Sequence, residues 1–554
     1  MTGGGDPGGS ARSYPPRDSR GEHDAIVIGA GLNGLVAALY LAQAGWKVLV
    51  LERNPKIGGA VMSGEITLPG FVHDLYATNQ NLFAGSPVYN EFRRDLERHG
   101  LFLVRSDKPN CNVFPDRSRI PMYRGAERML DVLRRHNPAD AEGWSELGGH
   151  FEAFHRSLIR LIGTPMPSRQ ALWILLKAIR TEGLDECRKL MQIVLSSTRQ
   201  LGETYFRSSE MRSLFAVWGM HLDFGPDVTG GGMFPFLETF SDVENGISIA
   251  KGGASKIVDS IAALLCERGG EIRINTEVDR VLIENGRAIG VVLTDGAAIK
   301  ARRAVIANVT PGPLFGRLLR DSGFAPALRR SISGYTYGPG TMMVHLALSA
   351  KPQWRAGGDT TEFAYVHIAP YVEDLDLAYS QSVNGLLPAS PLLIVGQTSA
   401  VDPTRAKDGQ ILWIQVRTLP SRIRGDALGT IAAANWDDAR EPYADRVIEK
   451  LEQYAPGIRK LILNRVAWSP ADLERANPNL SGGDSIGGSH HLAQNFFFRP
   501  IPGWSRYRTP LKRLYMCGAG TWPGAGAHGI SGYLCAREVL HPGILSGIRR
   551  LALR

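Results

Sequence analysis

The chain has 554 residues, of which 44% are hydrophobic and 21% are charged, and it carries a net charge of +9. This length exceeds what one hydrophobic core supports, so we expect a folded protein of two closely joined domains. The basic residues are spread out without a nucleic-acid-binding motif, and the five cysteines lack metal-ligand spacing, so the sequence argues against nucleic-acid binding and a metal site.

Residues 1–23 precede the first apolar run and are rich in glycine, proline, serine and charge. Such a composition buries too little apolar surface to fold, so we expect a disordered tail. The segment also lacks the apolar stretch of a signal peptide. Together with the few cysteines, this predicts a cytoplasmic protein, and peripheral contact with a membrane stays open.

Residues 24–52 predict a nucleotide-binding unit of strand, turn, helix and strand. An apolar run at 25–28 enters the turn Gly29-Ala30-Gly31-Leu32-Asn33-Gly34, a helix reaches residue 44, and a second apolar run at 48–51 ends at Glu52. Gly29 permits the turn, Gly31 lets the backbone approach a pyrophosphate, and Gly34 lets helix and strand pack closely. The helix start offers free N–H groups to phosphates, and Glu52 has the spacing of a carboxylate that binds ribose hydroxyls.

A double glycine, Gly58-Gly59, follows Glu52 and Arg53. A nicotinamide-binding unit has no need of it, whereas a flavin-binding loop must pass close to its cofactor. In this stretch the chain resembles the large FAD-dependent superfamily that includes flavin amine oxidases and phytoene desaturases. The resemblance implies that Glu52 holds the adenosine ribose, with Arg53 in the cofactor-binding set, and that Gly58, Gly59 and Ala60 pass near the pyrophosphate and flavin.

Residues 126–220 carry a helical pattern, with helices expected at 171–180 and 190–201, and a glycine cluster at 230–232 ends the block. We interpret this block as a helical cap on the substrate-binding domain. Several aromatic residues fit either a greasy cavity or an ordinary core. They are Trp173, Phe215, Trp218, Phe234, Phe236, Phe496, Phe497 and Phe498.

Residues 246–309 return to alternating helix and strand signals. A helix is expected after Gly252-Gly253, because apolar residues recur at helical spacing up to residue 265. Asn285-Gly286 and Asp295-Gly296 predict the turns of an antiparallel meander, and residues 304–307 a closing strand. We expect a strand to run into Val278, and the resemblance makes Val278 a candidate contact for the adenine.

The C-terminal block is the second strong signal. A strand at 514–517 and a helix from about residue 530 enclose a turn in which glycines are dense. Flexible loops are rarely clamped between a buried strand and an apolar helix, so a large group must approach this backbone. The glycines are Gly518, Gly520, Gly524, Gly526, Gly529 and Gly532.

The resemblance is specific in this block. In phytoene desaturase-like proteins a strand, turn and helix near the end close over the ribityl chain and flavin ring, and Gly518-Ala519-Gly520-Thr521 and His528-Gly529-Ile530-Ser531-Gly532 match that pattern. The residues 482–503 and 506–510 look like the branch of the pyridine nucleotide-disulphide oxidoreductase domain 2 proteins. Ala519 departs from the Asp that many flavoproteins carry, which leaves the cofactor contact to backbone amides. These motifs cover the FAD-binding half of the chain.

Candidates for catalysis are few. His528 lies in the flavin-covering turn and titrates near neutrality, so it is our candidate beside the flavin ring, against a structural hydrogen bond in the turn. Trp522 is a candidate for packing near the ring or lining the substrate entrance. Tyr76, Asn79 and Gln80 follow the first flavin loop and face either the ring or the core.

The expected fold is α/β, with a Rossmann-like FAD-binding domain of the glutathione reductase 2 or amine oxidase type. We assign residues 24–125, 245–320 and 501–554 to it. It is interleaved with a mixed α+β substrate-binding domain, residues 126–244 and 321–500, that carries the helical cap.

The expected activity is an FAD-dependent oxidoreductase that removes hydride from a C–H bond of an apolar or amphipathic small molecule. No second fingerprint for NAD(P) is present, so oxygen, a quinone or another external acceptor must reoxidise the flavin. Three alternatives stay open: an amine oxidase, a redox-neutral FAD-dependent isomerase and a non-catalytic lipid-binding escort. The substrate and the oligomeric state are left open.

Overall fold

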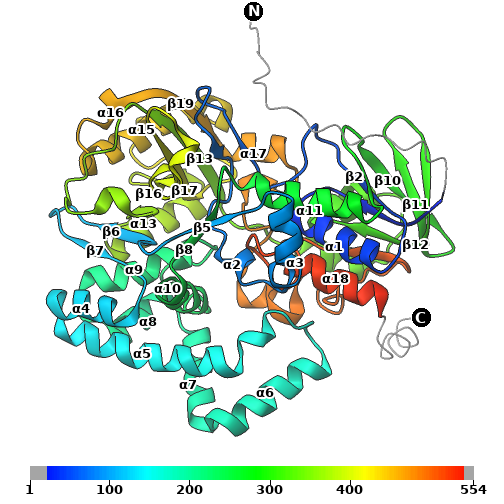
Figure 1. Ribbon diagram of the computed structural model, residues 1–554, viewed down its shortest axis with the longest axis horizontal. Coiled ribbons are helices and arrows are strands. Elements are labelled where there is room, and N and C mark those ends of the chain that lie inside the picture. Colours follow the sequence, from blue (N-terminus) through cyan, green and yellow to red (C-terminus); the bar gives the residue numbers. More distant parts are fainter. Residues whose placement is uncertain (1–21, 542–554) are drawn as a thin grey trace, which may run out of the picture.

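The computed structural model describes residues 22–541. Figure 1 shows two sheets with helices packed around them and a group of helices below one of the sheets. Within the described residues each large sheet has seven strands. No helix among these residues is both long and apolar enough to cross a membrane.

The first sheet is built on the predicted strand–turn–helix–strand unit. β1 (His23–Ile28), α1 (Leu32–Gln43) and β2 (Val48–Leu51) confirm the expected elements. β1 lies between β2 and β12 (Ala298–Ala307), and all three run in parallel. β9 (Glu271–Arg273) extends the parallel sheet beyond β2, and β20 (Leu514–Met516) extends it beyond β12. The loops that follow these strands therefore meet at one edge, where open α/β sheets bind their ligands.

The antiparallel meander continues this sheet. β10 (Val278–Glu284) and β11 (Arg287–Leu293) join at Asn285-Gly286, where both residues have positive φ, as the predicted turn requires. β12 pairs with β11 by its first residues and with β1 by its last ones, so the expected closing strand is the end of a longer one. The expected strand into Val278 is wrong, because Val278 begins β10 rather than ending a strand.

Three helices cover one face of the parallel sheet. α11 (Ser255–Glu267) and α18 (Ile530–Leu540) both pack against α1, and α3 (Pro87–Arg98) packs against α11 and α18 (Figure 1). α18 comes close to α1 because Gly532 has no side chain where the two helices meet. The beginning and the end of the chain thus form one layer.

The tail expected at residues 1–23 is only partly described. β1 already begins at His23. Residues 1–21, like residues 542–554 at the other end, lie outside the described residues, so the expected disorder stays a prediction.

The second sheet is mainly antiparallel, with a parallel pair between β14 and β6. β6 and β7 come from the range 24–125 that we assigned to the FAD-binding domain, so the first part of the second domain starts before residue 126. The strands in order are β19 (Ile462–Trp468), β13 (Gly340–Leu348), β17 (Gln410–Leu419), β16 (Leu392–Gly396), β14 (Tyr365–Ile368), β6 (Asn110–Val113) and β7 (Arg119–Pro121).

The two faces of this sheet have different roles. Along β17 Leu412, Ile414 and Val416 pack into the core under α15 (Trp436–Tyr454). Trp413 and Gln415 alternate with them and therefore point to the opposite face, which borders a cavity.

The helical cap is confirmed, but one expected helix is not. The segment 190–201 is broken at Ser196, whose backbone is extended, because Ser197 caps a new helix by bonding to Gln200. The cap also continues past the glycine cluster into one further helix. Its helices are α4 (Ala126–His136), α5 (Pro138–Ser157), α6 (Arg169–Glu182), α7 (Leu184–Leu195), α8 (Thr198–Tyr205), α9 (Ser209–Met220) and α10 (Met233–Asn245).

Shorter elements connect these layers. They are β3 (Ser63–Gly64), β4 (His73–Asp74), α2 (Asn81–Ala84), β5 (Leu103–Ser106), β8 (Ile247–Ala250), α12 (Pro326–Ser333), α13 (Val372–Val383), β15 (Leu386–Leu387), α14 (Thr398–Val401), β18 (Gly425–Asp426), α16 (Ile458–Leu461) and α17 (Pro470–Ala476).

Candidate functional site

The glycine turns from the two ends of the chain open on one cavity. Gly58 N–H donates to the carbonyl of Ala30 at 2.9 Å, which joins the first turn to the double-glycine loop. Gly532 N–H donates to Oδ1 of Asn33 at 3.1 Å, which joins the C-terminal helix to the same turn. The cavity has an empty volume of about 1560 Å³, part of it open to solvent. Typical ligand pockets hold about 300–1,000 Å³, so there is room for a second molecule beside a cofactor.

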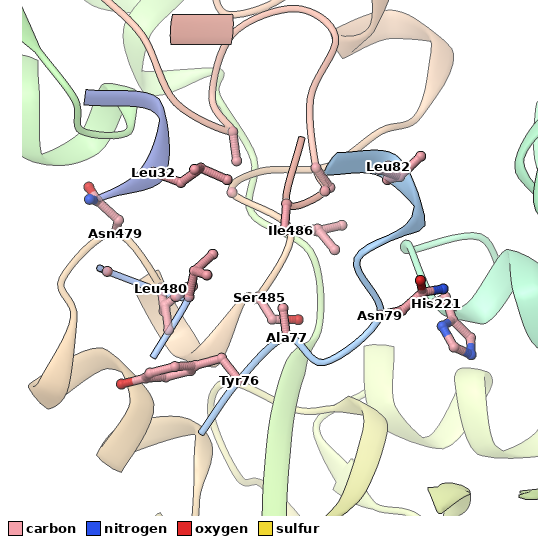
Figure 2. Close-up of a pocket in the computed structure, with 18 of the residues that line it drawn as sticks. Leu32, Tyr76, Ala77, Asn79, Leu82, His221, Asn479, Leu480, Ser485 and Ile486 are labelled. Atoms are coloured by element: carbon pink, nitrogen blue, oxygen red, sulfur yellow. The ribbon is translucent and has the colours of Figure 1, made fainter. Parts of the chain in front are cut away.

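Eight of the residues that we predicted to bind the cofactor line this cavity, and Figure 2 labels Leu32 at its edge. They are Gly31, Leu32, Asn33, Gly58, Gly59, Ala60, Gly518 and Ala519. Gly29, Ala30 and Gly34 lie directly behind them in the same turn, and Gly520 follows Ala519. The roles of all these residues remain predictions.

Tight packing explains why the turns need glycine. A Cβ on Gly34 would lie 2.3 Å from the carbonyl oxygen of Gly29, and one on Gly59 would lie 3.2 Å from Cα of Gly31. Gly518 has φ +110° and faces Oδ1 of Asn308. The backbone is therefore bare where the cavity passes between the two turns, and this cradle fits a pyrophosphate and its flanking groups.

Glu52 lies buried at the end of β2, next to the first turn. Its Oε2 accepts from the Ala30 N–H at 2.8 Å and its Oε1 from the Asn54 N–H at 2.9 Å. Each oxygen keeps a further lone pair for a ribose hydroxyl. Arg53 points elsewhere, because its Nη2 donates to the carbonyl of Arg475 at 3.2 Å.

Val278 lies at the adenosine end of the site. The preceding Thr276 N–H donates to the carbonyl of Glu52 at 2.8 Å, which holds this segment beside the predicted ribose contact. The Val278 side chain is buried against the first sheet with Ile28 and Leu51. Contact with an adenine stays a prediction.

His528 has the structural hydrogen bond that we weighed against catalysis. Its Nδ1 accepts from the Ile530 N–H at 2.9 Å, at the start of α18. Burial lowers the pKa of His528 to about 4, so the ring is neutral at physiological pH. Neither His528 nor Gly529, which packs on Val36 of α1, is among the residues that line the cavity.

Trp522 is likewise outside the cavity lining. Its Nε1 donates to the carbonyl of Thr164 at 3.0 Å, and its ring lies beside Phe496. These contacts give Trp522 a packing role, because they connect the C-terminal turn to the cap.

Arg499 fixes the turn around Ala519, and the sequence analysis missed it. Its guanidinium is fully buried and donates to the Ala519 carbonyl from Nε at 3.0 Å and from Nη2 at 2.8 Å. It also donates to the carbonyls of Gly487 at 3.0 Å and Ser489 at 2.7 Å. Arg499 therefore holds the loop 487–489 against the flavin-covering turn.

The far half of the cavity is largely apolar. Of the aromatic residues singled out in the sequence, Trp218 and Phe234 line it, whereas Phe215 and Phe236 belong to the core of the cap and Trp173 is exposed. Further apolar lining comes from Leu82, Leu222, Ile394 and Trp413.

The segment after the first flavin loop reaches this half. Tyr76 and Asn79 line the cavity, as Figure 2 shows, whereas Gln80 is fully buried behind them. His221 lies next to Asn79 in the same view. Burial lowers the pKa of His221 well below its usual value, so this ring is neutral.

Glu238 is the acid of this chamber. It lines the cavity from α10 and its Oε1 accepts from Nδ2 of Asn79 at 3.1 Å. Burial raises the pKa of Glu238 to about 7. Asp242, one turn further along α10, is buried too, and its pKa is also raised. Glu238 can therefore exchange a proton near neutral pH.

Several cavity residues had only a weak signal in the sequence. Asn308 directly follows β12, at the strand end where ligands bind, and its Nδ2 donates to the carbonyl of Gly29 at 3.3 Å. Gln415 and Arg417 are polar residues in an otherwise apolar strand. Glu238 interrupts an aromatic helix. A polar residue inside an apolar element was the signal available.

Comparison with known proteins gives a consistent result. The model of the flavin containing amine oxidoreductase family matches residues 32–540. The chain is 28% identical to pyridine nucleotide-disulfide oxidoreductase domain-containing protein 2 of Rattus norvegicus, over 94% of this chain and 93% of that protein. It is 25% identical to a limonene dehydrogenase of Castellaniella defragrans, over 93% of this chain and 94% of that polypeptide.

Two further similarities concern a desaturase and a solved structure. The chain is 27% identical to a neurosporene-forming phytoene desaturase of Rhodobacter capsulatus, over 94% of this chain and 95% of that protein. A triple mutant of putrescine oxidase superposes with a TM-score of 0.59 at 15% identity, over 96% of this chain and 99% of that one. At this identity the superposition speaks for the fold alone.

Proposed function

The chain belongs to the family of flavin-containing amine oxidoreductases, and from this premise we propose that it dehydrogenates an apolar or amphipathic small molecule. It is an FAD-dependent oxidoreductase of the predicted fold. The observation that carries the proposal is the continuity of the cavity, which runs from the glycine turns into the chamber lined by Trp218 and Phe234. A buried apolar chamber excludes water and holds an apolar C–H bond at the cofactor.

In this proposal each part of the chain has a role. The turn at Gly31 and the loop at Gly58-Gly59 hold the pyrophosphate, and Glu52 holds the ribose. The turn at Gly518 and the start of α18 cover the ribityl chain and flavin ring. When bound, FAD accepts the hydride, and oxygen, a quinone or another external acceptor takes the electrons onward.

The alternatives have less support. The amine oxidase among the comparisons is similar at 15% identity, whereas named dehydrogenases and desaturases align at 25–27% over more than nine-tenths of the chain. A cationic side chain in the chamber, Arg417, also repels an ammonium group. A redox-neutral isomerase is the second redox alternative, and a non-catalytic escort would have no need of both bare glycine turns.

We expect the purified protein to show the absorbance of oxidised flavin. Candidate substrates, tested under argon, should bleach this absorbance, and a product with one more double bond should form in equal amount. Turnover that needs a reductant but consumes no acceptor would instead identify an isomerase. Hydrogen peroxide release with amines alone would identify an amine oxidase, and a colourless protein without affinity for FAD would contradict the whole proposal.

We place the acceptor of the substrate proton at Glu238. Because its pKa is raised to about 7, the reactive carboxylate gains population as the pH rises through 7. We expect kcat/KM to rise from pH 6 to pH 8, and Glu238→Gln to lower kcat by about 10²–10⁴-fold at unchanged FAD binding. Glu244→Gln, an exposed change on the same helix, is the control. Equal pH profiles for Glu238→Gln and the unaltered protein would exclude this role.

The same group predicts a pH dependence of stability. The folded-state pKa of about 7 exceeds the ordinary value of 4.5, so the folded chain binds this proton more tightly than the unfolded chain. The contribution is complete below pH 4.5 and is lost as the pH rises through 7. Glu238→Gln should therefore raise the melting temperature relative to the unaltered protein at pH 8 more than at pH 5.

We also propose that α6 and α7 touch an anionic membrane surface. These helices carry exposed apolar side chains, among them Trp173 at 60%, Leu184 at 72% and Met191 at 62% exposure. Lys177 and Lys189 are exposed on the same two helices. An apolar face with basic neighbours is suited to the surface of an anionic bilayer. Figure 1 shows α6 and α7 together at the edge of the molecule.

Sedimentation with vesicles tests this surface. The protein should sediment with vesicles that contain an anionic lipid and stay in solution with neutral ones, and Trp173→Glu with Met191→Glu should abolish sedimentation. Leu377→Glu, a change at an exposed leucine on α13, should not. If the double variant dissociates a dimer and the unaltered protein ignores vesicles, the surface binds a second copy instead.

A further inference from the structure

Arg417 is a cation inside the substrate half of the cavity. It lies on β17 in the row of residues with Trp413 and Gln415, and all three line the cavity. Its burial lowers the pKa of Arg417 to about 10, so it still carries its charge at neutral pH. A charge in such a place needs a reason, because taking a guanidinium out of water costs free energy.

The hydrogen bonds of Arg417 go to neutral groups. Its Nε donates to Oε1 of Gln415 at 2.8 Å and its Nη1 to Oγ of Ser485 at 2.7 Å. Within residues 22–541 it forms no ion pair and Nη2 makes no hydrogen bond. The nearby acid Asp484 is engaged elsewhere, since it accepts from the N–H groups of Gly338, Ile486 and Gly488.

Other buried arginines show what is missing. Arg405 pairs with Asp74 at 2.6 Å, and Arg446 pairs with Asp426 at 2.6 Å. Arg499 is satisfied by backbone carbonyls. Arg417 differs from all of them, because it faces empty space and has a donor to spare.

The surroundings indicate what would occupy that space. The partner Ser485 lies in the middle of the cavity between Ile486 and Ala77 (Figure 2). The walls around it are formed by Trp218, Phe234 and Ile394. A ligand for this chamber is therefore mostly apolar and has one group that complements a guanidinium.

We propose that Arg417 binds the carboxylate of an apolar carboxylic acid, and that this acid is the substrate that the protein dehydrogenates. A planar carboxylate accepts from a guanidinium in a bidentate way, and its single negative charge neutralises Arg417. A dianionic phosphate would leave a net charge buried. The neutral His221 and the largely protonated Glu238 add no competing charge. This identification of the substrate class rests on the function proposed above.

Binding of simple probes tests the proposal without turnover. Decanoate and 1-decanol share an apolar chain and differ in charge. We titrate each into the FAD-loaded protein and follow the flavin absorbance and the heat of binding. Decanoate should bind at least tenfold more tightly than 1-decanol, and Arg417→Gln should weaken decanoate about 10- to 100-fold while leaving 1-decanol unchanged. Arg417→Lys should restore part of the preference, because it keeps the charge but loses the bidentate geometry.

Controls separate this role from cofactor binding and from folding. Arg422→Gln, an exposed change just beyond β17, should bind both probes as the unaltered protein does. If Arg417→Gln loses FAD, Arg417 serves the cofactor and the proposal is overturned. Equal affinity of the unaltered protein for both probes also overturns it. Preferential decanoate binding without any bleaching by acids would keep the carboxylate site and reject dehydrogenation of acids.

Discussion

Gly532→Ala is expected to weaken FAD binding by about tenfold or more and to give a nearly colourless protein. A Cβ at this position would lie 2.1 Å from the carbonyl oxygen of Asn33 and 2.9 Å from its carbon. Both atoms belong to the backbone at the start of α1, so α18 and the first glycine turn must move apart. Overpacking of this kind costs about 1–3 kcal/mol, and each 1.4 kcal/mol is a factor of ten in affinity.

The measurement is a titration of the apoprotein with FAD, followed by flavin fluorescence. Gly149→Ala is the matched control, because Gly149 also lies in a helix but has open space where its Cβ would be. Alanine there should leave FAD binding unchanged and slightly raise stability. If Gly532→Ala binds FAD as tightly as the control does, the close packing of α18 on α1 is not needed for the cofactor.

The nucleotide-binding half could be predicted because its chemistry constrains the backbone. Gly34 has to be glycine, since a Cβ there would overlap the Gly29 carbonyl. The same holds for Gly58, with φ +122° and the Val61 carbonyl 2.6 Å from a Cβ. Such requirements are local and leave a pattern in the sequence. The fold, the cofactor and the enzyme class follow from that pattern, and the comparisons confirm them.

The substrate half could not be predicted in the same way. Arg417, Glu238 and Asn79 come from β17, from α10 and from the loop before α2, and the cavity brings them together. Their proximity depends on sheet order and helix packing, which leave no fixed spacing in the chain. His528 shows the converse case, because a suitable residue in the right turn points its Nδ1 at its own helix.

Arg405→Met is expected to destabilise the protein by about 3–5 kcal/mol, the usual cost of leaving a buried charge without its partner. Arg405 is fully buried, and its Nη1 lies 2.6 Å from Oδ2 of Asp74. Its Nη2 donates to the carbonyl of Ala250 at 2.6 Å. The pair joins the two domains, because Asp74 belongs to the flavin loop and Arg405 follows α14. Thermal unfolding should show a melting temperature lower by roughly 5–10 °C.

An exposed ion pair provides the control for this change. Arg475 and Asp437 are both more than half exposed, so Arg475→Ala should cost less than about 1 kcal/mol. If the two variants melt alike, burial does not decide the cost of the lost pair.

The double variant Arg405→Met with Asp74→Asn shows whether the loss arises from the unpaired charge. Asp74 also accepts from Oγ1 of Thr78 at 2.6 Å and from the Ala254 N–H at 2.7 Å, and an amide keeps only part of this set. With both charges gone, the double variant should be more stable than the sum of the single losses predicts, by about 1–3 kcal/mol. Because Thr78 adjoins Asn79 in the cavity wall, the single variants should also bind substrate less tightly, whereas purely additive losses would mean that Arg405 and Asp74 act independently.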